Sequence, residues 1–177
     1  MTPTTAASIV LAGLCCFSAQ AFSADDCTDF KWDVSKERAL FAGPAAALPG
    51  GTDVKSAPPI MPNRLYRLQL APQSKVRFAA APGKTTHADG DFAGLAKLTI
   101  AQSGSYRVAI DAQFWIDVVS KRALMAATDF QGQHGCSAPH KIVQFDFTAM
   151  QPLILQLSGA SVDHILVTIT PTPARAL

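Results

Sequence analysis

The sequence predicts an all-β domain, an antiparallel β-sandwich or jelly roll of about eight strands with an N-terminal strap. From Leu65 onward apolar and polar residues alternate with a period of two, as in half-buried strands. Turn residues separate these segments at intervals of roughly 8–14 residues, which is typical of sandwiches and barrels. No segment has the period of a long amphipathic helix. The 177 residues are 49% hydrophobic, enough for the core of one domain.

The strands follow one another with short turns between them. The alternation predicts strands at residues 65–70, 76–78, 95–100, 106–111, 114–119, 142–147, 153–157 and 165–169, and residues 124–133 hold at most one more.

The N-terminal part of the chain has a different character. Residues 30–34 alternate like a short strand, and residues 35–41 predict a helical turn or two. Residues 43–63 contain five prolines and a Gly-Gly pair, which predicts a linker or surface arm rather than a core element. We therefore divide the mature chain into a strap and linker at residues 22–63 and a sandwich domain at residues 64–177.

The first 21 residues have the features of a secretory signal peptide. No charged side chain precedes Asp25, and residues 6–17 form an apolar run too short to span a bilayer. Ala19-Gln20-Ala21 is a small-x-small site, so we expect cleavage before Phe22. A cut after Ala24 and lipidation at Cys15 or Cys16 fit the flanking residues less well. The mature protein is then periplasmic or secreted and has no transmembrane segment.

Cleavage leaves two cysteines, Cys27 and Cys136. In an exported protein the simplest prediction is one disulfide, which would fasten the strap to the far end of the domain. The alternative makes Cys136 a thiolate ligand of a transition metal together with His134 and His140. That spacing matches no strong metal-binding motif, so the metal site is a candidate only.

The segment from Tyr106 to Val119 contains an aspartate in an apolar pattern. Residues 106–119 are expected to form a hairpin. If its loop has two or four residues, Trp115 and Asp117 share a face with apolar residues. Asp117 is then either a ligand anchor or raised-pKa acid beside a Trp115 platform, or a structural carboxylate bonded to loop N–H groups or to an arginine such as Arg107 or Arg122. A loop of odd length would move Asp117 to the other face.

Two stretches of the chain carry a family resemblance. The first comprises residues 105–111 and 114–119; the second comprises His134-Gly-Cys136 and residues 141–147 and 153–159. Their order of glycine turn, Tyr, apolar strand, Asp, second strand and Leu-rich strand resembles small secreted β-sandwich proteins of Gram-negative bacteria and is similar to bacterial pre-peptidase C-terminal domains. The resemblance covers roughly residues 65–171 and implies an accessory module that binds surfaces or assists secretion.

Similar small proteins are sometimes labelled homogentisate 1,2-dioxygenase, but the residues here do not support that activity. Enzymes of that name are much longer and hold iron with two His and one Glu, whereas Glu37 is the only Glu of this chain and has no His near it in the sequence.

These observations favour an exported binding or accessory protein with no catalytic residues evident and no cofactor. Its partner would be an envelope protein or a small ligand. A net charge of +2 gives no support for nucleic-acid binding. The chain has no GxSxG motif and no glycine-rich phosphate loop, and one Glu excludes a Glu pair. The alternatives are a small metal-dependent oxidoreductase, dioxygenase-like, using a His/Cys/Asp site, and a structural module of the envelope.

Overall fold

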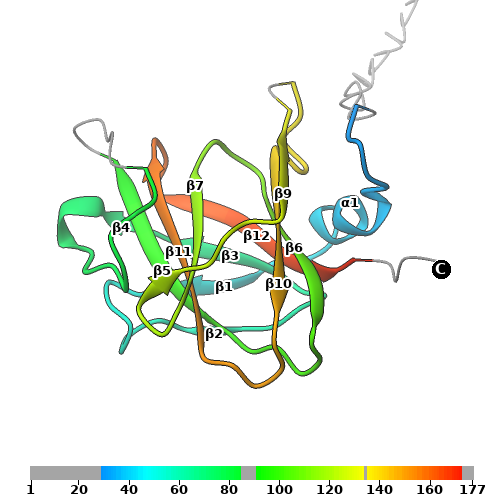
Figure 1. Ribbon diagram of the computed structural model, residues 1–177. Coiled ribbons are helices and arrows are strands. Elements are labelled where there is room, and N and C mark those ends of the chain that lie inside the picture. Colours follow the sequence, from blue (N-terminus) through cyan, green and yellow to red (C-terminus); the bar gives the residue numbers. More distant parts are fainter. Residues whose placement is uncertain (1–28, 85–90, 134, 173–177) are drawn as a thin grey trace, which may run out of the picture.

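The computed structural model describes residues 29–84, 91–133 and 135–172, which form two packed β-sheets (Figure 1). The all-β sandwich predicted from the sequence is therefore confirmed. In order across the first sheet lie β1 (Ala46–Pro49), β3 (Leu65–Gln69), β12 (His164–Pro171), β6 (Gly104–Ile110), β10 (Lys141–Phe147) and β9 (Asp129–Gly132). The second contains β2 (Pro59–Ile60), β5 (Phe92–Leu98), β11 (Leu153–Ala160), β7 (Trp115–Ser120) and β8 (Ala123–Leu124), and β4 (Ala71–Pro72) also pairs with β5.

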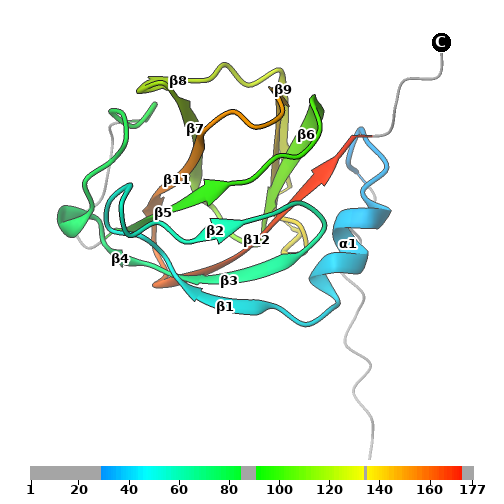
Figure 2. The same ribbon diagram turned by 90° about the horizontal axis from the view of Figure 1, so that it is seen from below.

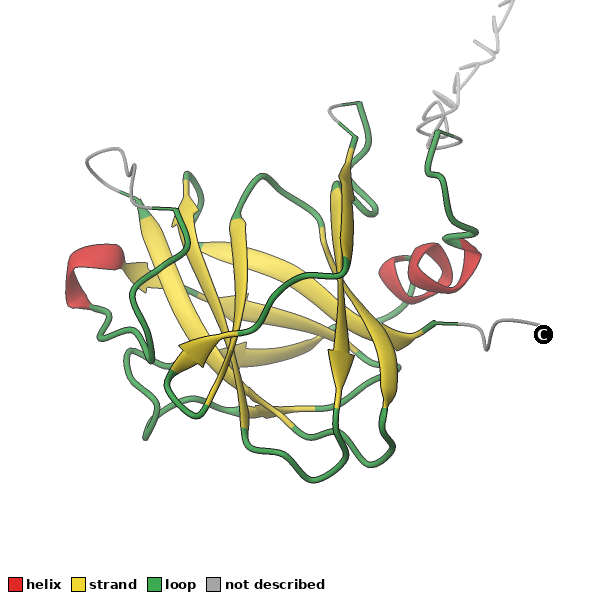
Figure 3. Ribbon diagram, viewed as in Figure 1, coloured by secondary structure: helices red, strands yellow, loops and turns green. Residues whose placement is uncertain are grey.

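The described residues form twelve strands rather than about eight. The difference lies mainly in strands of two to four residues, which are too short to show an alternating pattern. Seven of the expected strands are present with ends shifted by a few residues, and the uncertain stretch at 124–133 contributes β8 and β9. Residues 76–78 form no strand, although Val76 is buried. Two short helices, α1 (Ser35–Phe41) and the 3₁₀ helix η1 (Gln73–Lys75), lie outside the sheets (Figure 3).

The proline-rich stretch at 43–63 is part of the sandwich, so the expectation of a linker or surface arm was wrong. β1 runs parallel to β3, and β2 runs parallel to β5, so both sheets are mixed rather than purely antiparallel. Ile60 is fully buried. Prolines suit these positions because β1 and β2 are edge strands. Gly51 is required between them, since a Cβ there would lie 2.5 Å from the Cα of Ala57.

The core lies between the facing sides of the two sheets. Val108, Phe145 and Ile169 of the first sheet are buried against Val118 and Leu155 of the second. This inner surface is nearly continuous and explains the strong period of two in the long strands.

The segment 106–119 does not form a hairpin. β6 pairs with β10 and β12 in the first sheet, whereas β7 pairs with β11 and β8 in the second. The chain crosses between the sheets at residues 111–114, and the buried Phe114 fills the crossing. Two strands separated by a few residues usually pair with each other, and alternation alone does not distinguish that hairpin from a crossover.

The N-terminal strap packs on the outer face of the first sheet, and α1 lies against β12 (Figure 2). The predicted helix at 35–41 is confirmed. The predicted strand at 30–34 was wrong, because that segment pairs with no strand; Phe30 and Val34 are buried instead against Ile142 and Cys136. No helix in the described residues is long and apolar enough to cross a membrane.

Candidate functional site

A cleft of about 600 Å³ lies between the two sheets, on the side where β8 and β9 are the edge strands. Figure 2 shows the segment that joins β8 to β9 passing from one sheet to the other. The short edges leave the sheets open here. On the opposite side the chain from β1 to β2 joins the two edge strands, and Ala57 in this connection is buried with Ala93 and Leu95 of β5. Most of the lining is apolar and comes from both sheets: Trp115, Leu124, Met125, Phe130, Val143 and Phe145.

Two large apolar side chains are exposed at this cleft. Phe130 of β9 is 66% exposed, and Leu124 of β8 is exposed as well. Single exposed apolar residues are ordinary, but two of them on the separate edges of one apolar cleft are typical of a binding surface.

Asp117 connects the Trp115 side chain to the backbone of Gly83 in the wall of the cleft. Its Oδ1 accepts a hydrogen bond from the indole Nε1 of Trp115 at 3.0 Å, and its Oδ2 accepts one from the backbone N–H of Gly83 at 2.9 Å. Asp117 is buried, so these two donors satisfy a carboxylate that would otherwise be costly. The carboxylate thus bonds to a loop N–H, one of the two interpretations open from the sequence, and it also fixes the Trp115 ring.

Two lysines lie near the ring of Trp115. The Nζ of Lys141 is 4.9 Å from the ring centroid and that of Lys84 is 5.9 Å away. Lys141 also donates to the carbonyl oxygen of Phe114 at 3.0 Å. Burial lowers the pKa of Lys141 below 10.5, and the Lys84 ammonium lowers it further, while Asp117 acts in the opposite direction. In the described part of the chain, two lysines and one carboxylate thus stand at the polar end of the cleft, an excess of one positive charge.

The residues considered for a metal site do not come together in the described part of the chain. His140 lines the cleft, and its Nδ1 lies 3.0 Å from the carbonyl oxygen of Cys136. Cys136 itself is buried in the apolar cluster beneath the strap. Within the described residues, no group of three or more His, Cys, Asp or Glu side chains is placed to hold a metal ion. His134 and Cys27 lie outside these residues, so the metal site and the disulfide stay predictions.

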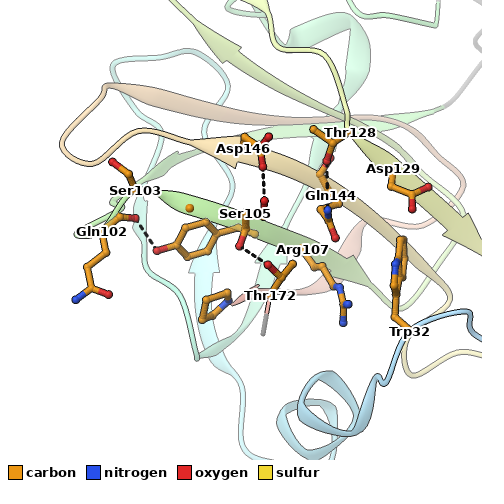
Figure 4. Close-up of a pocket in the computed structure, with 13 residues that line it drawn as sticks. Trp32, Gln102, Ser103, Ser105, Arg107, Thr128, Asp129, Gln144, Asp146 and Thr172 are labelled. Carbon is orange, nitrogen blue, oxygen red and sulfur yellow. Dashed lines mark hydrogen bonds between the residues drawn. The ribbon is translucent and has the colours of Figure 1, made fainter. Parts of the chain in front are cut away.

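A larger hollow, of about 1010 Å³, lies on the outer face of the first sheet beside the strap (Figure 4). Many of its polar groups already bond to one another. The Tyr106 hydroxyl donates to the carbonyl oxygen of Gln102, and the Ser105 hydroxyl donates to Asp146. Trp32 lies close to two cations, with the Arg107 guanidinium 4.9 Å and the Lys31 Nζ 4.8 Å from its ring. A ligand would have to displace these contacts, so the apolar cleft is the stronger candidate.

The sequence identified part of this cleft. Trp115, Asp117 and His140 were singled out, and all three line it. Phe130, Leu124 and Met125 were not, because they lie in the stretch whose strands were uncertain. The only signal available was a Phe within an otherwise polar segment, and nothing in the sequence shows that Leu124 and Phe130 line the same cleft as Trp115.

No family model matches the chain, and no curated protein is significantly similar to it.

Proposed function

We propose that the protein is an exported binding protein that holds a small, largely apolar ligand in the cleft between β7 and β8 on one side and β9 and β10 on the other. The observation that carries this proposal is the apolar cleft with Phe130 and Leu124 exposed at its edges. Its volume falls within the range of small-molecule sites, roughly 300–1000 Å³.

The lining also has the composition of such a site. An apolar surface supplies most of the binding free energy, and a few fixed polar groups orient the ligand. Trp115 is held by Asp117, so its ring is oriented before a ligand arrives. This fixed geometry reduces the entropy lost on binding.

Export rests on the N-terminal signal described above, and it goes together with the Cys27–Cys136 disulfide. In protein purified from the periplasm, we expect neither cysteine to react with a maleimide until a reductant is added. Reaction of both thiols without reductant would contradict the disulfide, although it would leave the cleft unaffected.

The neutral fluorescent probe N-phenylnaphthylamine tests binding at the cleft. We expect a saturable rise in probe emission with the wild-type protein and at least a tenfold weaker affinity for Phe130→Asp. Met61→Asp is the matched control, because Met61 is also a large exposed apolar residue but does not line the cleft. Absence of saturable binding, or equal weakening by both variants, would contradict the proposal.

A further inference from the structure

A second, smaller cavity of about 260 Å³ adjoins the apolar cleft. The two share Gln113, Trp115 and Lys141 in their walls. The second cavity adds Lys84 and Ser158 to these shared residues. A single ligand lying along the Trp115 side chain therefore reaches both.

The smaller cavity contains the positive charge of the site. Lys84 and Lys141 both line it, and their ammonium groups lie 5.9 Å and 4.9 Å from the Trp115 ring. The carboxylate of Asp117 is close, but its two oxygens already accept from Trp115 and Gly83. Among the described residues that line the two cavities, two cations and one carboxylate leave one excess positive charge at their junction.

Ser158 supplies an unused hydroxyl at the same place. It lies on β11 directly opposite Trp115 of β7, and residues opposite each other on neighbouring strands share a face of the sheet. The side chain is 1% exposed, and its Oγ makes no hydrogen bond to any described residue. Buried hydroxyls in proteins almost always have a partner. Ser158 lies in the wall of this cavity while its Oγ is closed off from solvent, so a ligand oxygen that reaches the Oγ would supply the missing partner.

We infer that the smaller cavity is an anion subsite, and that the ligand is a small amphiphile with one negatively charged group, of the carboxylate type. Lys141 and Lys84 pair with the charge, the Ser158 hydroxyl donates to one of its oxygens, and the apolar body lies along Trp115 into the larger cleft. A monoanion fits because it neutralises the single excess positive charge. This inference rests on the proposed function, since it identifies the chemical class that the same cleft accepts.

The test compares octanoate with octanol, which have the same apolar chain and differ in charge. Displacement of N-phenylnaphthylamine at neutral pH measures both affinities. We expect octanoate to bind at least roughly tenfold more tightly than octanol, because charge-assisted hydrogen bonds in a partly buried site are stronger than neutral ones. At high salt the difference between octanoate and octanol should shrink. Salt screens the exposed Lys84 more strongly than the half-buried Lys141.

Variants separate the subsite from the cleft. Lys141→Gln and Ser158→Ala should weaken octanoate binding much more than octanol binding. We expect the same result for Lys84→Gln. Lys84 is exposed, so this substitution should not impair folding. Lys97→Gln is the matched control, since Lys97 is also half-buried and donates to a backbone carbonyl, that of Lys55, but lines neither cavity.

Each outcome decides a different part of the account. Selective loss of octanoate binding in the Lys141, Lys84 and Ser158 variants supports the anion subsite. Equal affinities of the wild-type protein for octanol and octanoate would overturn the subsite but not the cleft. Failure to bind either compound, or the probe, would overturn the proposed function as well.

Discussion

Removing the carboxylate of Glu37 should destabilise the protein, because this residue anchors the strap to the first sheet. Glu37 lies on α1 and is 2% exposed. Its Oε1 accepts a hydrogen bond from the Thr170 hydroxyl and lies 3.8 Å from the guanidinium of Arg107 on β6. Arg107 is buried too, so each of the two charges depends on the other.

The magnitude follows from the separation and the burial. Two unit charges 3.8 Å apart attract by about 4 kcal/mol at an effective dielectric constant of about 20. Leaving one buried charge without its partner costs about 3–5 kcal/mol in comparable proteins. Arg107 keeps its hydrogen bond to the carbonyl oxygen of Asp33 and its contact with Trp32. We therefore expect Glu37→Gln to lower the free energy of unfolding by about 3 kcal/mol, near the lower end of that range.

Urea unfolding followed by circular dichroism measures this change. Glu37→Gln keeps the size of the side chain, and its amide oxygen still accepts from Thr170, so the charge is the main difference. Combining Glu37→Gln with Arg107→Met should recover much of the lost stability, because no buried charge is then unpaired. Arg77→Met is the control, since the Arg77–Asp53 ion pair is exposed and its loss should change little. A loss below about 1 kcal/mol for Glu37→Gln would refute the claim that a buried ion pair anchors the strap.

Three further predictions concern individual residues. Burial raises the pKa of Asp111 above 3.8 in the folded protein, so its contribution to stability falls as pH rises through that raised pKa. Asp111→Asn keeps an oxygen that accepts from the Leu166 N–H. In thermal unfolding measured from pH 3 to 7, the variant should not show this pH-dependent loss of stability; the same pH dependence as in the wild-type protein would contradict the prediction. Because the pKa of Lys141 is lowered, the protein should gain stability as pH rises from that pKa toward 10.5, and Lys141→Gln should not; an identical gain in the variant would contradict it. Gly83→Ala places a Cβ 2.9 Å from both the Trp115 Nε1 and the Asp117 Oδ1, so it should weaken probe binding severalfold and also lower the free energy of unfolding; unchanged affinity would show that the ring is not positioned there.

The long strands were predictable because their side chains face a continuous core. Leu68, Val108, Phe145 and Leu155 are buried on inner faces, and each belongs to a segment whose alternation is visible in the sequence. β1 and β2 were not predicted because their sequences contain prolines and small residues. A short parallel edge strand needs no alternation of apolar and polar residues, and it tolerates the missing N–H of a proline.

The candidate site was predictable only in part. Trp115 and Asp117 stood out because a carboxylate in an apolar strand needs a partner, and the structure supplies Gly83 as one. The pairing of β6 with β7 was wrong, because a crossover between sheets and a hairpin have the same local pattern. Phe130 and Ser158 became relevant only through contacts between segments that are far apart in the chain.

The most direct test of the central claim uses the emission of Trp115 itself. The chain has two tryptophans, so the Trp32→Phe variant leaves Trp115 as the only reporter, and Phe keeps an aromatic ring beside Arg107. Titration with octanoate should change its emission to a plateau at one ligand per chain, and adding Phe130→Asp should weaken that response at least tenfold. Emission that stays constant as octanoate is added would contradict a ligand site at Trp115.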